Sequence, residues 1–115
     1  MYDKNNVFFK ILNKEIPATV VYEDDVCLAF NDINPKSKIH VLVISKGLYR
    51  NFTEFANCES AETIQKFFSA VAKIADKLGI ADSGYRILSN IGPDANQEVQ
   101  HFHLHILGGE PLDGM

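Results

Sequence analysis

The sequence predicts an antiparallel α+β domain, and three observations carry this prediction. Short apolar and β-branched runs recur along the 115 residues, separated by polar turn residues, as in strands joined by tight connections. Residues 60–79 instead repeat their apolar side chains at the 3.6-residue period of a helix. Because the links between strands read mostly as hairpins, antiparallel pairing is favoured over parallel crossovers.

A short amphipathic helix is predicted near the N-terminus, over residues 6–13. It ends before Pro17, since proline cannot continue a helix. Four apolar side chains follow the helical spacing: Val7, Phe8, Ile11 and Leu12.

Three strands are predicted next, at residues 19–22, 26–30 and 40–45. The charged residues 23–25 separate the first two, so we expect a hairpin there. Alternate side chains of a strand point to opposite faces. In the third strand the even-numbered residues therefore share one face, and His40 is among them.

The clearest helix covers residues 60–79. Ser60 suits its N-cap, Glu62 lies in the first turn, and Gly79 is a natural C′ stop. We expect its apolar stripe to pack against the sheet; the stripe comprises Ile64, Phe67, Phe68, Val71, Ile74, Ala75 and Leu78.

Two further strands are predicted after this helix, at residues 85–91 and 101–107. A loop rich in turn residues, 92–99, joins them, and Gly108-Gly109 closes the second. The prediction is therefore a five-stranded antiparallel sheet with one long helix and a short N-terminal helix.

The composition fits a single domain over residues 1–115, with 46% hydrophobic and 23% charged residues. A net charge of −4 argues against nucleic acid polymers and anionic membranes as partners. Cys27 and Cys58 form no CxxC pair, and residues 1–9 lack the apolar stretch of a signal peptide or membrane span. We therefore expect a cytoplasmic protein with free thiols.

Three of the four histidines stand at alternating positions, His101, His103 and His105. In a strand this spacing places the three imidazoles on one face and the intervening apolar residues on the other. Histidine is not a strong strand former, and a solvated strand face is normally built from Thr, Lys or Glu. The row therefore calls for a chemical explanation.

Three interpretations of the row remain open. The imidazoles can be structural groups satisfied by hydrogen bonds on a half-buried face. They can bind zinc, with Glu98 recruited as a further ligand, although other carboxylates and thiols do not cluster near the motif. Alternatively, one imidazole can attack an electrophilic phosphorus or carbonyl while its neighbours orient it and handle protons. Under this third interpretation the middle residue, His103, is the nucleophile.

The surroundings of the histidines suit a small phosphorylated ligand. In the preceding loop Asn96 tolerates a left-handed backbone, so consecutive N–H groups can form an anion nest. Asp32 can accept hydrogen bonds from a diol or simply form a turn. Four apolar residues can build a slot for a base or belong to the core: Val7, Phe8, Ile11 and Ile33.

The segment His101–Leu107 has the form of the histidine triad signature, and the chain resembles the histidine triad nucleotide-binding proteins, in particular their bacterial purine nucleoside phosphoramidase branch. The likeness extends along nearly the whole chain. The other matching positions are Phe8–Pro17, Tyr22–Asp25, Leu28–Phe30, Asp32-Ile33, His40–Ile44, Gly84–Arg86, Asn90, Gln97 and Gly108-Gly109.

The resemblance implies a hydrolase that cleaves purine nucleoside phosphoramidates, or related nucleotidyl adducts, through a nucleotidyl-histidine intermediate. It implies that His103 is the nucleophile, that His105 lies by the phosphate and leaving group, and that His101 and His40 support them. The implied substrate-binding residues are Asp32, Ile33, Phe8, Val7, Ile11, Phe30, Asn90, Gln97, Glu98 and Val99. Two alternatives remain: a dinucleoside polyphosphate hydrolase, and a nucleotide-binding partner protein whose hydrolysis is incidental.

The resemblance further implies a homodimer whose two sheets join into one ten-stranded surface, with residues 85–88 and the long helix as candidate interface elements. No cofactor is implied. Zinc-binding relatives carry cysteines and a histidine where this chain has Asn6, Phe9 and Leu48, so we expect no metal.

Two departures from the family pattern lie just before the triad. Asn96 replaces the usual glycine, and Glu98 replaces a serine common in relatives. The phosphate donor would therefore be a backbone N–H instead of a hydroxyl, and Glu98 would repel a more highly charged polyphosphate.

Overall fold

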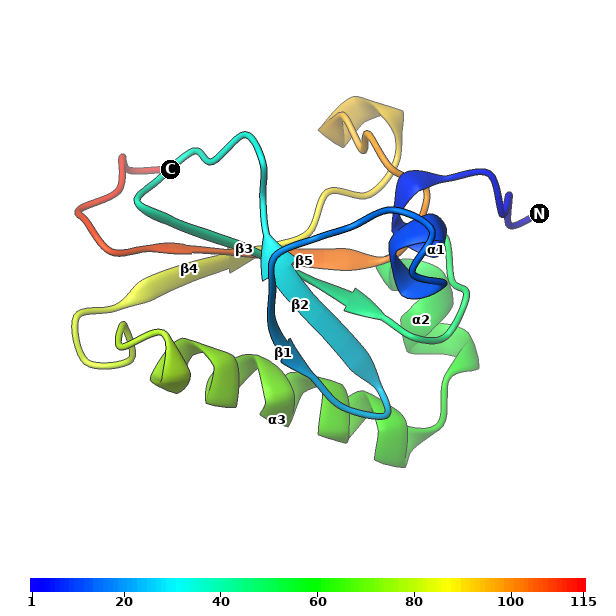
Figure 1. The fold of residues 1–115 in the computed structure, drawn as a ribbon, viewed down its shortest axis with the longest axis horizontal. Helices are drawn as coiled ribbons and strands as arrows, with labels where there is room; N and C mark the ends of the chain where they lie inside the picture. Colours follow the sequence, from blue (N-terminus) through cyan, green and yellow to red (C-terminus); the bar gives the residue numbers. More distant parts are fainter.

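The computed structural model describes all 115 residues and contains one five-stranded antiparallel sheet of order β1-β2-β3-β5-β4 (Figure 1). The two outer strands, β1 and β4, form its edges. The strands are β1 (Val20–Glu23), β2 (Cys27–Asn31), β3 (Ile39–Ser45), β4 (Tyr85–Leu88) and β5 (His103–Gly108). The helices are α1 (Val7–Leu12), α2 (Phe52–Cys58) and α3 (Ala61–Lys77), with a 3₁₀ turn at Pro93–Ala95. The predicted α+β class and antiparallel sheet are confirmed.

Helix α3 runs along one face of the sheet (Figure 1), and the main hydrophobic core lies between that face and the helix. Apolar residues at alternate positions of β2, β3 and β5 point to this face and meet the buried side of α3. They include Val41 and Val43 of β3 and Leu104 and Ile106 of β5. The alternation read from the sequence is therefore correct for both strands.

The long helix begins and ends as its sequence predicts. The Ser60 hydroxyl accepts a hydrogen bond from the Thr63 N–H, and Gly79 follows the last turn with a φ of +76°. Phe67 is completely buried, whereas its neighbour Phe68 is 36% exposed and lies at the edge of the packed stripe.

A smaller apolar cluster lies on the other face of the sheet, under α1. It comprises Phe8, Leu28, Phe30, Leu42 and Ile44. Asn6 caps α1 by accepting from the Phe9 N–H. Because α1 covers only one end of this face, the remainder is left for the histidines.

The start of the predicted histidine strand and the end of the strand before it differ from the prediction. The strand begins at His103, not at His101, because the Phe102 N–H donates to the carbonyl of Tyr49 instead of joining the ladder with β3. The fourth strand ends at Leu88, not Ile91, because the next residue, Ser89, donates its hydroxyl hydrogen bond to the carbonyl of His103.

Helix α2 was not predicted. Seven residues supply too little periodicity, and only Phe55 among them is buried. Its N-cap, Asn51, accepts from the Glu54 N–H, and this cap residue is a local helix signal in the sequence.

The two cysteines are unpaired; Cys27 is buried in the core and Cys58 is exposed. No helix in the structure combines the length and the apolar character that crossing a bilayer requires.

Candidate active site

A cleft of about 540 Å³ opens on the α1 side of the sheet, where β3 and β5 lie side by side. Eight of its lining residues were predicted as site residues: Phe8, Asp32, His40, Asn90, Glu98, Val99, His103 and His105. Seven others were not: Asn34, Lys36, Leu42, Leu88, Ala95, Asn96 and Leu107. Strand alternation could have found Leu42 and Leu107, since they share faces with His40 and His105.

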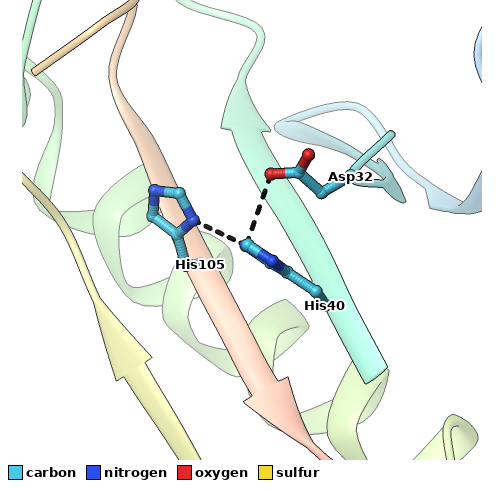
Figure 2. Close-up of side chains that lie close together, drawn as sticks. All are labelled: Asp32, His40 and His105. Atoms are coloured by element: carbon cyan, nitrogen blue, oxygen red, sulfur yellow. Dashed lines mark hydrogen bonds and ion pairs between the residues drawn. The ribbon is translucent and has the colours of Figure 1, made fainter. Parts of the chain in front are cut away.

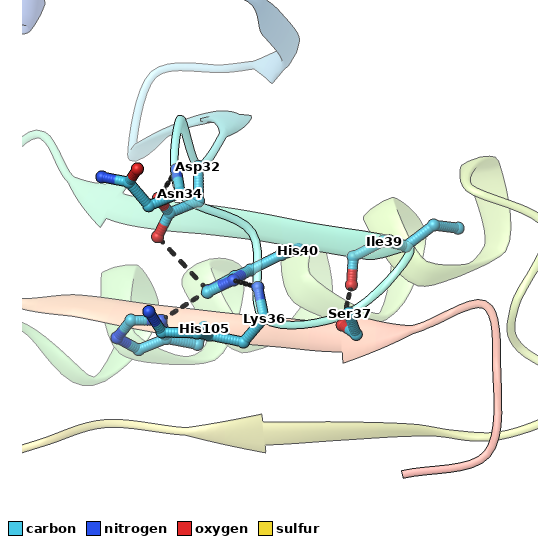
Figure 3. A network of polar contacts seen from close by, with 7 residues as sticks. All are labelled: Asp32, Asn34, Lys36, Ser37, Ile39, His40 and His105. Carbon is cyan, nitrogen blue, oxygen red and sulfur yellow. Dashed lines mark hydrogen bonds and ion pairs between the residues drawn. The ribbon is translucent and has the colours of Figure 1, made fainter.

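His40, His105 and Asp32 converge at one end of the cleft (Figure 2). Nε2 of His40 lies 2.9 Å from Nδ1 of His105 and 3.4 Å from a carboxylate oxygen of Asp32. The Lys36 backbone N–H donates to Nδ1 of His40 at 3.0 Å (Figure 3). Since that Nδ1 must accept, the proton of neutral His40 resides on Nε2 and is donated to His105. In neutral His105 the proton is consequently on Nε2.

Asp32 also forms the turn considered from the sequence. Its Oδ1 accepts from the Asn34 N–H at 2.8 Å (Figure 3). Its other oxygen, Oδ2, faces His40. The carboxylate can thus serve the turn and still present acceptor capacity to the cleft.

His103 occupies the centre of the row, and its tautomer follows from one contact. Its Nδ1 lies 2.6 Å from the backbone carbonyl oxygen of His101, which can only accept, so Nδ1 carries the proton. Nε2 is left with its lone pair and has no hydrogen-bond partner. Every buried side-chain nitrogen and oxygen does have a partner, so Nε2 of His103 is accessible. Phe8 packs edge-on against the ring, with centroids 4.9 Å apart.

His101 does not share the cleft with the other histidines, which corrects the expected row of three. Its side chain is fully buried beneath the N-terminal segment. Nε2 lies 2.7 Å from the Ser45 carbonyl oxygen, and Nδ1 lies 2.5 Å from the Tyr2 hydroxyl. His101 supports His103 through its backbone carbonyl, not through its ring.

All four histidines are held neutral at pH 7. Burial lowers the pKa of His101 and of His105 to about 4, and it lowers the pKa of His103 below the ordinary value. Burial also lowers the pKa of His40, against the opposing effect of Asp32. A neutral imidazole is the nucleophilic form, so His103 has the charge state that covalent catalysis needs.

The charged residues of the cleft are two acids and one base: Asp32, Glu98 and Lys36. Next to Glu98, the backbone N–H groups of Glu98 and Val99 donate no hydrogen bond within the chain. Asn96 adopts the expected left-handed conformation just before them, at φ 58°. These two amides are available donors for an anion beside His103.

Five residues predicted to bind substrate do not line the cleft. Phe30 is buried in contact with Phe8, and Ile33 is 92% exposed in the turn. Val7 is 39% exposed, and Ile11 packs against the smaller apolar cluster that contains Phe8. Gln97 instead holds the loop: its amide donates to the carbonyls of Arg50 and Val99 and accepts from the Gly92 N–H.

Asp32, His40 and His105 are also the one set of potential metal ligands that lie close together. Coordination through Nε2 of His40 would require the proton to move to Nδ1, where the Lys36 N–H already donates. The hydrogen-bond pattern therefore suits a proton-bearing pair better than a metal centre.

Comparison with known proteins adds the family. The model of the HIT domain matches residues 13–112. The chain belongs to the HIT domain family. An uncharacterized HIT-like protein of Rickettsia prowazekii is 44% identical over all of this chain and 96% of its own length. The purine nucleoside phosphoramidase of Escherichia coli K12 is 38% identical, covering 97% of this chain and 93% of that protein.

Solved HIT structures share the fold over nearly the whole chain. A HIT family hydrolase from Clostridium thermocellum superposes with a TM-score of 0.90 at 41% identity, covering 98% of this HIT protein and 97% of the relative. A histidine triad protein from Clostridium difficile gives the same TM-score at 39% identity, covering 100% and 99%.

Proposed function

We propose that this HIT protein is a nucleotidyl hydrolase that cleaves purine nucleoside phosphoramidates, or related nucleotidyl adducts, to the nucleoside monophosphate. The observation that carries the proposal is the tautomer of His103: its Nδ1 proton is engaged by the His101 carbonyl, so an accessible Nε2 lone pair faces the cleft. The hydrolase and phosphoramidase relatives support this reaction class.

In the proposed first step, Nε2 of His103 attacks the phosphorus and the bond from phosphorus to the leaving nitrogen breaks. The leaving amine takes one proton from cationic His105, which gains that proton from solvent as the anionic phosphoryl group binds beside it. The product is a nucleotidyl group bonded to His103. The amides of Glu98 and Val99, which donate no hydrogen bond within the chain, would donate to the phosphoryl oxygens.

In the second step, water attacks the same phosphorus and the bond to His103 breaks. The proton lost by water goes to His105, which releases it to solvent as the nucleoside monophosphate leaves, so the free enzyme is again neutral and no metal takes part. Asp32 would hold the ribose hydroxyls, and Phe8 offers an apolar surface to the base.

The test is a metal-free incubation with adenosine 5′-phosphoramidate. We expect AMP to form at an undiminished rate in EDTA, and a rapid quench in alkaline denaturant to trap a nucleotidyl adduct on His103. His103→Asn keeps an N–H for the His101 carbonyl and removes the nucleophile, so it should bind the nucleotide without turnover. Turnover by this variant, or an adduct on another residue, would rule out the proposed mechanism.

A polyphosphate hydrolase is less well supported by the same cleft. The cleft is lined by two carboxylates, Asp32 and Glu98, and by one ammonium group, Lys36. This net negative charge repels the additional phosphate groups of a polyphosphate. The smaller, singly charged phosphoramidate is the better match.

A further inference from the structure

Tyr2 makes a contact that the proposed reaction does not use. Its hydroxyl oxygen lies 2.5 Å from Nδ1 of His101, across 99 positions of sequence, and its ring packs edge-on against the imidazole with centroids 5.6 Å apart. Tyr2 also packs against Phe9 of α1, at 6.3 Å. The first residues of the chain are thus attached to the segment that leads into β5.

A turn holds Tyr2 in this place. The Asn5 N–H donates to the Asp3 carboxylate at 2.8 Å, and the Asn6 amide donates to the Asp3 carbonyl at 2.7 Å. Asn6 is also the N-cap of α1. The turn therefore connects Tyr2 to a helix that packs on the sheet, and the position of the hydroxyl does not depend on the His101 contact alone.

The contact determines where His101 carries its proton. The Ser45 carbonyl oxygen, 2.7 Å from Nε2, can only accept, so Nε2 is protonated. Nδ1 of the neutral ring must then accept, and the Tyr2 hydroxyl is its donor. Burial raises the pKa of Tyr2, so the hydroxyl keeps its proton throughout the neutral range. Without that hydroxyl, a fully buried ring would have an unpaired acceptor.

His101 transmits this constraint to His103. The same residue whose ring is fixed on both sides supplies the carbonyl that accepts from Nδ1 of His103 at 2.6 Å. A displacement of the His101 ring that carries the backbone with it would move this carbonyl and weaken the contact that keeps the His103 proton on Nδ1. The Nε2 lone pair would then be present in only part of the molecules.

We propose that Tyr2 is a positioning residue for the nucleophile: by fixing the ring of His101, it keeps the His101 carbonyl in place and His103 in the tautomer with a free Nε2. This proposal rests on the assignment of His103 as the nucleophile. Tyr2 does not line the cleft, so it acts without touching the substrate.

The test compares Tyr2→Phe with Tyr22→Phe, using full-length protein with any affinity tag at the C-terminus. Tyr22→Phe is a matched control because it also removes a hydrogen-bonded hydroxyl. Tyr22 lies on β1 and donates to Asp24 in the turn after that strand, and neither residue lines the cleft. For Tyr2→Phe we expect kcat on adenosine 5′-phosphoramidate to fall about three- to tenfold with KM unchanged, as for one lost hydrogen bond. Tyr22→Phe should retain wild-type kinetics.

A substrate-free readout separates positioning from stability. Nitrogen-15 NMR of the histidine rings distinguishes protonated from unprotonated nitrogens. In the wild type His103 should show a protonated Nδ1 and a free Nε2; in Tyr2→Phe it should show a mixture of both tautomers. A Tyr2→Phe protein with wild-type kcat, or with a lower kcat but unchanged His103 nitrogen shifts, would overturn the proposal, as would an equal loss in Tyr22→Phe.

The two proposals fail in different ways. If His103→Asn keeps full turnover, the covalent mechanism is wrong, whereas the NMR comparison still shows whether Tyr2 sets the tautomers of His101 and His103. If the adduct forms on His103 but Tyr2→Phe changes neither tautomer nor kcat, only the role of Tyr2 is lost.

Discussion

At the scale of single residues, protonation decides what the histidines can do. The backbone carbonyl of His101 fixes the proton of His103 on Nδ1. The Lys36 backbone N–H fixes the proton of His40 on Nε2, and His40 in turn donates to His105. Burial then keeps these rings neutral. The division of labour among chemically identical side chains therefore follows from their hydrogen-bond partners.

The buried His101 should make folding stability depend on pH. As the pH falls through 6.5, the unfolded histidine takes up a proton, while the folded one stays neutral until about pH 4. The unfolded state therefore binds more protons in this window, and the free energy of unfolding should decrease by up to about 1.4 kcal/mol per pH unit for this residue. Urea titrations of wild type and His101→Gln between pH 7 and 5 measure the slope; equal slopes would contradict the assignment.

Glu98 should govern discrimination against polyphosphates. Glu98→Gln removes one negative charge from the cleft lining, so kcat/KM for diadenosine tetraphosphate should rise about three- to tenfold relative to the phosphoramidate. Asp94→Asn is the matched control, because Asp94 is an exposed acid in the same loop that does not line the cleft. An identical rise in both variants would point to net charge alone.

At the scale of elements, a phenylalanine cluster joins the histidine segment to the helices. Phe102, between His101 and His103, stacks on Phe55 of α2 at 4.5 Å and contacts Phe67 of α3 at 5.3 Å. The packing of Phe102 on the helices of one face thus fixes where β5 starts, and with it the position of His103 and His105 on the opposite face.

Two adjacent residues of α3 test this packing. Phe67→Ala should lower the free energy of unfolding by about 3–5 kcal/mol, because it opens a cavity at a completely buried site. Phe68→Ala, one position along and 36% exposed, should lower it by about 1 kcal/mol. Chemical denaturation measures both, and similar losses would mean that the two side chains share the core equally.

At the scale of the whole molecule, the two edge strands differ in their exposed large apolar side chains: β4 carries two, and β1 carries one, Val20. The edge strand β4 exposes Tyr85 and Ile87, by 38% and 47%. An exposed apolar edge strand is a template for pairing with another strand. We propose that two copies pair here and form a homodimer with one continuous sheet.

A charge on either edge tests the dimer. Ile87→Lys should yield monomers in light scattering, because a two-fold axis would bring two ammonium groups together. Val20→Lys places the same charge on the opposite edge strand, β1, at a residue 49% exposed, and should remain dimeric. A monomeric wild type, or dissociation by Val20→Lys alone, would contradict pairing through β4.

The sequence by itself determined the sheet, its two faces, the long helix and the three histidines that line the cleft. These features are local: the period of two in strands, the period of 3.6 in α3 and the Ser60 cap all follow from neighbouring residues. The site composition could be read for the same reason, since His40, His103 and His105 lie on strand faces that alternation identifies.

Only the tertiary structure decided that His101 leaves the row and that Tyr2 and Ser45 bind its ring. It also decided that Lys36 lines the cleft while Gln97 supports the loop. These outcomes depend on contacts between segments distant in sequence, such as Tyr49 with Phe102 and Tyr2 with His101. No periodicity encodes such contacts, because they arise from the way the whole chain packs.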